Sequence, residues 1–283
     1  MKIGSILTAI LILGTVGCQP ADNYSVSLND TANVINGTKV NARSSKAARS
    51  VVLIDLMNSA GVGISFCTAT LVGPHTILTA GHCFDPALLK EFVSFRVLFT
   101  NSYSEAFFAE SRQGVYFKKH PQYHTEKTYD HDIAIGIFSG DIPAGYNTVA
   151  MDDDITANYA NVKTYVYGYG RTIDYSGKPS ENYRYSGGDL HKGTLEVYSD
   201  YGQFPDRYHV VAETANHLCQ GDSGGPQFYN EGGALKVIGV NSAVGGERLS
   251  NGFRRCTSWS QATKVAPAYE WFKKEEKKGL RKL

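Results

Sequence analysis

The chain has 283 residues, of which 42% are hydrophobic and 19% charged, and its formal net charge at neutral pH is +1. A chain of this length buries a sizeable core and forms one large or two small domains. The balanced charge gives no reason to expect a nucleic-acid partner, and the abundant tyrosine and glycine favour strands and turns over long helices.

The N-terminal residues predict export. Met1-Lys2 precedes an apolar run from Ile3 to Val16, which is shorter than the about 20 residues that a membrane-spanning helix needs. We therefore expect residues 1–17 to form a secretory signal peptide. Cys18 follows Gly17, an arrangement similar to the lipidation motif of bacterial lipoproteins. That resemblance implies a lipid anchor on Cys18 and a periplasmic or outer-membrane lipoprotein. The alternative is ordinary cleavage nearby, which leaves a thiol.

Residues 18–33 are polar and rich in Asp, Asn, Ser and Thr. This composition predicts a flexible tether or pro-segment. Val34-Ile35-Asn36-Gly37 follows, and by itself it predicts a strand start and a turn, because Asn-Gly is a turn dipeptide.

Short apolar segments separated by turn signals predict β-structure in the first half of the chain. Segments 51–54, 66–72 and 76–78 are apolar, and glycine or Gly-Pro turns lie between them. Residues 92–100 alternate between apolar and polar side chains, as a half-buried strand does. Strands at this spacing favour an antiparallel barrel or sandwich.

A histidine motif, Thr79-Ala80-Gly81-His82-Cys83, follows the third segment. The string resembles the catalytic-histidine motif of the trypsin-like (chymotrypsin-family) serine proteases. Cys67 precedes Cys83 by 16 residues, as in that family's disulfide around the histidine. The resemblance implies a Cys67–Cys83 bond that holds the loop presenting His82. A crosslink of this length stabilises by about 3 kcal/mol in the chain-entropy model.

The candidate acid is Asp132, which heads an apolar run and matches the family's aspartate motif. The neighbouring Asp130 is interpreted as a solvated loop acid, because the acid of a catalytic triad is buried. His120 and His124 are four residues apart and would fit metal ligands on one helix face. Pro121 lies between them and disfavours that helix, so we expect no metal site.

Further elements are expected in the second half. Residues 164–170 predict a strand ending in a glycine turn, similar to the start of the family's second barrel. Residues 171–193 predict a surface loop, and residues 234–240 predict a strand. The acids Asp152 to Asp154 are interpreted as a solvated turn, with calcium binding as the alternative.

The stretch 219–226 places Ser223 between small residues, which lets backbone N–H groups approach a developing oxyanion. Residues 221–225 also fit the G-x-S-x-G elbow of α/β-hydrolases, whose histidine follows the serine. No histidine follows Ser223. The order His82, Asp132, Ser223 is the trypsin-like order.

The resemblance covers nearly the whole mature chain and implies an all-β fold. It implies two packed antiparallel Greek-key barrels of six strands each, the active site in the cleft between them, and a C-terminal helix. The peptidase domain is expected at 34–283, with the first barrel at 34–146, the second at 147–262, and the helix and a solvated basic tail at 263–283.

The family's mechanism assigns a role to each matching residue. Ser223 would attack the scissile carbonyl, His82 would act as general base, and Asp132 would orient His82. Backbone N–H groups of Gly221 and Ser223 would form the oxyanion hole. Ser242 would hydrogen-bond Asp132 and help to bind the substrate backbone.

The resemblance also implies a second disulfide, Cys219–Cys256, which leaves Cys18 available for lipid. Val34 matches the family's new N-terminus, whose amine pairs with the acid before the serine, here Asp222. This implies a zymogen cut after Asn33, which departs from the usual Arg or Lys.

The substrate pocket is expected around His217, six residues before Ser223, where the family sets P1 specificity. Because His217 is not an aspartate, we do not expect cleavage after Lys or Arg. Val244 and Ser260 would line the same pocket. His217 either favours a polar or acidic P1 side chain or simply fills space.

Together these features predict a secreted or lipid-tethered serine endopeptidase that acts on proteins or peptides as a monomer. An activating protease is the other expected partner, and no cofactor, metal or nucleic acid is expected. The alternative is a catalytically weak or inactive protease-like binding protein, which usually lacks a triad member.

Overall fold

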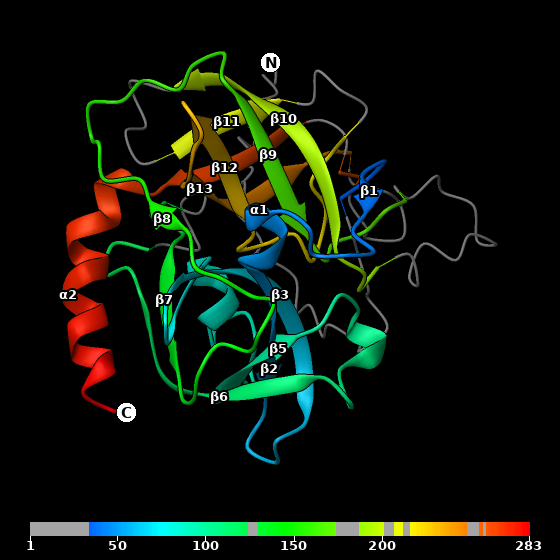
Figure 1. Cartoon of the computed structure of the whole chain (residues 1–283), viewed down its shortest axis with the longest axis vertical. Coiled ribbons are helices and arrows are strands. Elements are labelled where there is room, and N and C mark those ends of the chain that lie inside the picture. The colour runs from blue at the N-terminus through cyan, green and yellow to red at the C-terminus, as the bar shows by residue number, and fades with distance from the viewer. Residues whose placement is uncertain are drawn as a thin grey trace, which may run out of the picture.

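The computed structural model describes residues 34–123, 130–173, 187–200, 207–211, 216–247, 255–256 and 259–283. Two β-barrels, one from each half of the chain, pack together, and a helix ends the chain on their flank (Figure 1). The predicted all-β class and C-terminal helix are confirmed. The expected signal peptide, tether and Cys18 lie outside the described residues. No helix in the described part is long and apolar enough to span a membrane.

The first barrel closes through antiparallel strands in the order β2-β3-β4-β7-β6-β5. These strands are β2 (Val51–Met57), β3 (Gly63–Gly73), β4 (Thr76–Thr79), β5 (Ser94–Phe99), β6 (Glu110–Lys119) and β7 (Ala134–Phe138). All of β2 is buried, as a continuous apolar run predicts. Its one acid, Asp55, accepts a hydrogen bond from Arg96 Nε at 2.9 Å.

The second barrel follows the order β10-β11-β14-β13-β12-β9, and pairing of β9 with β10 closes the ring. Its strands are β9 (Lys163–Gly168), β10 (His191–Asp200), β11 (Arg207–Val211), β12 (Pro226–Glu231), β13 (Ala234–Gly245) and β14 (Trp259–Lys264). Two short strands attach to it: β1 (Thr38–Lys39) pairs with β10, and β8 (Ala150–Met151) pairs with β13. The segment before the first barrel is therefore bound to the second.

Two strand boundaries differ from the prediction. His191 to Gly193, expected in a surface loop, begin β10 and pair with β9. Thr263 and Lys264, expected in the C-terminal helix, end β14 and pair with β13. Both segments carry polar side chains, so local propensity does not predict them as strands. Pairing with neighbouring strands on the barrel wall outweighs that propensity.

The acidic turn is only partly solvated. Asp153 and Asp154 are exposed, but Asp152 is buried. Its Oδ1 accepts a hydrogen bond from Tyr159 at 3.0 Å and lies 3.1 Å from Lys236 Nζ. The interpretation of Asp152 as a solvated acid was wrong, because a cation beneath the turn pairs with it.

The C-terminal helix α2 (Tyr269–Leu280) extends through the stretch expected to be a solvated tail. It packs on β6 and β7 along one flank of the molecule (Figure 1). Two acids of this helix, Glu275 and Glu276, are buried. Tyr116 of β6 donates a 2.6 Å hydrogen bond to Glu275, and Lys273 pairs with Glu276. Glu275 therefore anchors the helix to β6.

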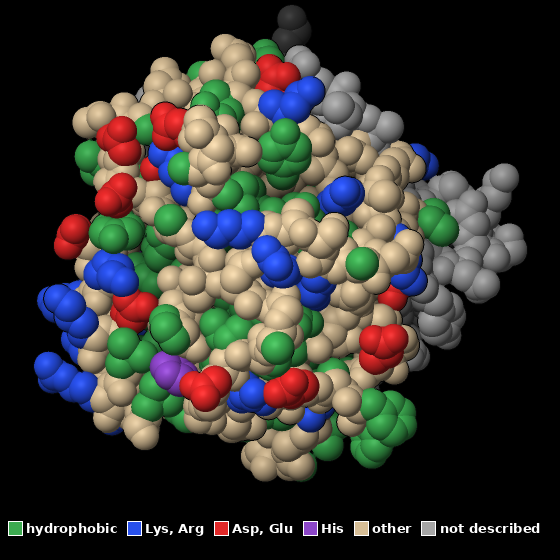
Figure 2. Space-filling view, in the orientation of Figure 1, with side chains coloured by type: hydrophobic (Ala, Val, Ile, Leu, Met, Phe, Trp, Pro, Cys, Tyr) green, Lys and Arg blue, Asp and Glu red, His purple; other side chains and the backbone are tan. Residues whose placement is uncertain are grey.

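The short helix α1 (Lys46–Arg49) lies between the barrels, and Ser45 caps it by accepting from Ala48 N at 3.1 Å. Arg43, just before it, joins the two halves of the chain. Its Nη2 donates to Thr100 O at 2.7 Å and to Tyr169 Oη at 2.8 Å. Figure 2 shows Lys and Arg side chains across the middle of the face that carries α1, with acids nearer its edges.

Candidate active site

His82 lies on a one-turn 3-10 helix, η1 (Gly81–Phe84), directly after β4. Its ring Nδ1 is 2.7 Å from Asp132 Oδ2, and its backbone N–H donates to Asp132 Oδ1 at 2.7 Å. Gly81 allows this approach, because an added Cβ would lie 3.1 Å from Asp132 Oδ1. Two bonds from one residue fix both the position and the ring orientation of His82.

Asp132 is fully buried just before β7. Ser242 Oγ, from β13 of the other barrel, donates to its Oδ2 at 2.6 Å. Burial disfavours the charged imidazolium of His82, but the Asp132 carboxylate outweighs that effect and raises the pKa of His82. A carboxylate so placed holds the proton on Nδ1 and leaves Nε2 able to accept a proton.

The loop carrying Ser223 is fastened to the first barrel. Thr68 N donates to Ser223 O at 2.9 Å, and Thr68 Oγ1 donates to Gly221 O at 2.8 Å. Thr68 follows Cys67, which is bonded to Cys83, the neighbour of His82. A side chain at Gly224 would collide with Thr79 Oγ1 and Thr68 O. These contacts bring the serine loop beside the histidine.

Two peptide groups of this loop are oriented by their carbonyls. Gln220 O accepts from Arg171 N at 3.2 Å, and Asp222 O accepts from Gly225 N at 3.0 Å. Because a trans peptide is planar, its N–H points opposite to its carbonyl. The N–H groups of Gly221 and Ser223 therefore point away from these anchors.

Asp222 is buried and its carboxylate accepts from the N–H groups of Gly170 and Cys219, each at 2.9 Å. Burial raises the pKa of Asp222 to about 7, and these two hydrogen bonds oppose that effect. Val34 is fully buried in the core of the second barrel. Among the described residues no cation pairs with this carboxyl to compensate its burial, so it holds its proton unusually well.

The expected pocket residues occupy neighbouring positions on the second barrel. Val244 and Ser260 are paired across β13 and β14. His217 forms a backbone bridge with Ile35, with hydrogen bonds of 2.8 and 3.2 Å. Ile35 and Val244 belong to one apolar cluster with the Cys219–Cys256 disulfide. Ser242 is the extra residue of a β-bulge in β13, a device that re-aims side chains beside active sites.

Sequence reasoning missed several residues that position the site. Thr68 and Arg171 anchor the serine loop, as does Asn241, whose Nδ2 donates to Asp222 O at 3.2 Å. Asn241 had a signal in the sequence, because it is a polar residue directly before Ser242 at the end of an apolar strand. The other two carry no such signal.

The described residues offer no usable set of metal ligands here. The one close group of candidate ligands is Cys67, His82 and Cys83, with ligand atoms within 4.8 Å of one another. Both sulfurs are joined in a disulfide, so neither is a thiolate. His124, which was weighed with His120 as a possible metal ligand, lies outside the described residues.

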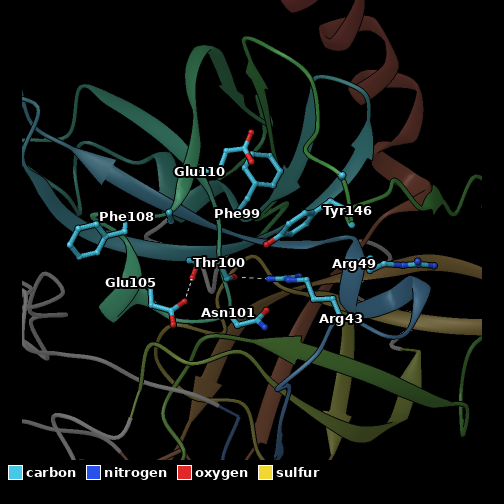
Figure 3. A pocket seen from close by; sticks show the side chains of 12 residues that line it. Arg43, Arg49, Phe99, Thr100, Asn101, Glu105, Phe108, Glu110 and Tyr146 are labelled. Carbon is cyan, nitrogen blue, oxygen red and sulfur yellow. Dashed lines mark hydrogen bonds between the residues drawn. The ribbon is translucent and has the colours of Figure 1, made fainter.

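A separate cavity of about 700 Å³ is lined by residues from Arg43 to Tyr146 and is not lined by His82, Asp132 or Ser223. Figure 3 shows Arg43 reaching Thr100 at its floor, with Tyr146 beside it. The Arg43 guanidinium also lies 4.4 Å from the centre of the Tyr146 ring. Arg43 in this cavity is therefore interpreted as a structural arginine.

Comparison with known proteins gives concordant similarities. The family model described as Trypsin matches residues 34–271. A curated trypsin of Saccharopolyspora erythraea is 28% identical over 193 residues, which cover 64% of this chain and 76% of that protein. A solved structure titled HL collagenase superposes with a TM-score of 0.65 at 17% identity, over 86% of this chain and 98% of that chain. At that identity the structural likeness concerns the fold.

Proposed function

Since the chain belongs to the trypsin family of serine proteases, we propose that it is an active serine endopeptidase with the triad His82, Asp132 and Ser223. The observation that carries the proposal is the bonded array at Asp132. One buried carboxylate accepts from the backbone and ring of His82 and from Ser242. A recognition module has no need of this array, whereas a general base does.

In the proposed reaction Ser223 Oγ attacks the scissile carbonyl while His82 Nε2 takes its proton. The carbonyl oxygen becomes an oxyanion held by the N–H groups of Gly221 and Ser223. His82 then gives the proton to the leaving amine, which yields an acyl-enzyme. Water, deprotonated by the same imidazole, attacks the acyl group, and Ser223 recovers its proton as the acid product leaves.

The chain is proposed to act outside the cytoplasm. Two disulfides, Cys67–Cys83 and Cys219–Cys256, are typical of an oxidising compartment. Export through residues 1–17 supports the same location, and lipid on Cys18 would tether the protein to a membrane. The substrate is a protein or peptide.

Activation is proposed to follow a cut after Asn33. The new amine of Val34 would then pair with the carboxylate of Asp222. Burial of Val34 in the second barrel and the raised pKa of the buried Asp222 carboxyl support this. An activating protease is the proposed partner for this cut, and Asn33 differs from the usual Arg or Lys at that position. N-terminal sequencing of active protein should yield a chain starting at Val34, and active protein lacking that start would refute the idea.

Specificity is proposed to differ from that of trypsin. His217 replaces the aspartate expected for Lys or Arg recognition, and Val244 and Ser260 add no negative charge. We expect a polar or acidic P1 side chain to be preferred. A P1 peptide library tests this, and a strong Lys or Arg preference would refute it.

The rival function is protein recognition without catalysis, and a serine-directed fluorophosphonate probe separates the two. The active form should be labelled, and Ser223→Ala should abolish labelling. Ser104→Ala, which alters an exposed hydroxyl that is hydrogen-bonded to Ser102, is the matched control and should label normally. Absent labelling of the wild type, or unchanged labelling in Ser223→Ala, would favour the rival.

A further inference from the structure

A chain of buried polar side chains leads from the core of the second barrel to the serine loop. It consists of Thr164 on β9, Gln227 on β12 and Asn241 on β13. Each is at most 2% exposed. Buried polar groups are costly unless they are paired, so such a chain in a barrel interior calls for a reason beyond packing.

Each link of the chain fixes the direction of the next. The Thr164 hydroxyl lies 2.6 Å from Gln227 Oε1 and 3.1 Å from Leu195 O. Gln227 Nε2 donates to Asn241 Oδ1 at 2.6 Å. Because the oxygen of Asn241 is occupied by this donor, its NH₂ group must face the other way, and it donates to Asp222 O at 3.2 Å.

The Asn241 backbone is bonded to the same loop. Its carbonyl accepts from Gly224 N and its N–H donates to Gly225 O, each at 2.8 Å. The residue therefore holds three points of residues 222–225. The side-chain bond acts on the carbonyl of the Asp222–Ser223 peptide, and the planarity of that peptide transmits the orientation to Ser223 N–H.

We propose that Asn241 is a positioning residue for the oxyanion hole. Its side-chain amide, oriented by Gln227 and Thr164, holds the Asp222–Ser223 peptide so that Ser223 N–H faces the reacting carbonyl oxygen. This inference rests on the proposed peptidase function. It adds that Ser223 N–H is held in its orientation by a chain of polar side chains inside the second barrel.

The test compares Asn241→Leu with the double variant Asn241→Leu/Gln227→Leu. Loss of one complete oxyanion donor costs about 10² to 10³ in kcat. The Gly225 bond still holds the peptide in Asn241→Leu, so we expect kcat to fall by about 10- to 100-fold with KM within about threefold. The rate constant for fluorophosphonate labelling should fall with kcat.

The double variant separates positioning from stability. In Asn241→Leu the Gln227 amide is left buried and unpaired, so the melting temperature should fall. Replacing both amides removes that orphan, and Thr164 keeps its Leu195 acceptor. We expect the double variant to regain much of the lost melting temperature while kcat stays low. Recovery of kcat in parallel with the melting temperature would overturn the proposal.

Controls keep the result attributable. Thr164→Val removes the far end of the chain, and kcat should fall by less than in Asn241→Leu, because Gln227 Nε2 still donates to Asn241 Oδ1. If Asn241→Leu does not fold, the double variant alone carries the comparison with the wild type. If the wild type is labelled at Ser223 and both Asn241 variants keep normal rates, only the positioning role is overturned. No labelling of the wild type would overturn the proposed function and this inference with it.

Discussion

The Asp132 carboxylate has two bonds to His82 and one to Ser242, and this arrangement decides the protonation state of the site. His82 as general base must be neutral before it takes the proton of Ser223. Burial alone would lower its pKa, and the nearby carboxylate reverses the direction. The acid limb of activity therefore reports the balance of these two effects.

Asp132→Asn should move that limb. Without the negative charge, burial of the imidazole dominates and the pKa of His82 falls, so the acid limb of kcat/KM shifts to lower pH. Activity at the plateau should drop by about 10⁴-fold, because the proton is no longer held on Nδ1. The pH profile of kcat/KM measures both effects. Asp130→Asn is the control, and an acid limb unmoved in Asp132→Asn would contradict this account.

At this scale the sequence points to the residues proposed for the reaction more readily than to the residues that support them. Local strings around His82, Asp132 and Ser223 suffice to propose the triad. Thr68 has no motif, since its role depends on a hydrogen bond to Gly221 across 153 positions of chain. Such contacts exist only after both barrels have closed.

At the scale of elements, apolar alternation located the strands that have one clearly buried face, such as β5. It missed β10 and β14, whose polar residues are acceptable on a barrel wall because their backbone groups pair on both sides. It also misjudged α2. Interleaved Lys and Glu predicted a solvated end, but Glu275 is buried because Tyr116 and Lys278 satisfy it.

Tyr116→Phe tests whether this anchor stabilises the helix on the first barrel. The Glu275 carboxylate would lose its buried donor, at a cost of about 1–3 kcal/mol. In a chain of this size that lowers the melting temperature by roughly 2–4 °C per kcal/mol. Calorimetry measures the shift. Lys277→Ala, on the exposed side of the same helix, should change it little. Equal shifts in the two variants would show that Glu275 is not an anchor.

At the scale of the whole molecule, the site exists only where the barrels meet. His82 and Asp132 come from the first barrel, and Ser223 and Ser242 come from the second. The first residues of the peptidase domain cross to the second barrel, where Val34 is buried and β1 pairs with β10. In the proposed activation, the N-terminal end would act on the serine loop through Asp222, far from it in sequence.

That coupling predicts a pH dependence of stability that differs between the uncut chain and a chain starting at Val34. In the uncut chain the pKa of Asp222 is raised to about 7, above the about 3.9 of an unfolded aspartate. Between these values the folded chain keeps a proton that the unfolded chain has lost. The stabilisation is complete below the unfolded pKa and is lost as pH rises through the folded pKa.

The melting temperature of the uncut chain should therefore fall from pH 5 to pH 7, by an amount reflecting a few kcal/mol at most. Asp222→Asn should remove this component. In the chain starting at Val34, the new amine favours the charged carboxylate and lowers the pKa of Asp222, so the fall should be reduced or reversed. Both chains are measured as Ser223→Ala variants to prevent self-digestion. If the melting temperature changes with the same slope between pH 5 and 7 in both chains, and Asp222→Asn leaves that slope unchanged, this carboxyl does not sense the N-terminus.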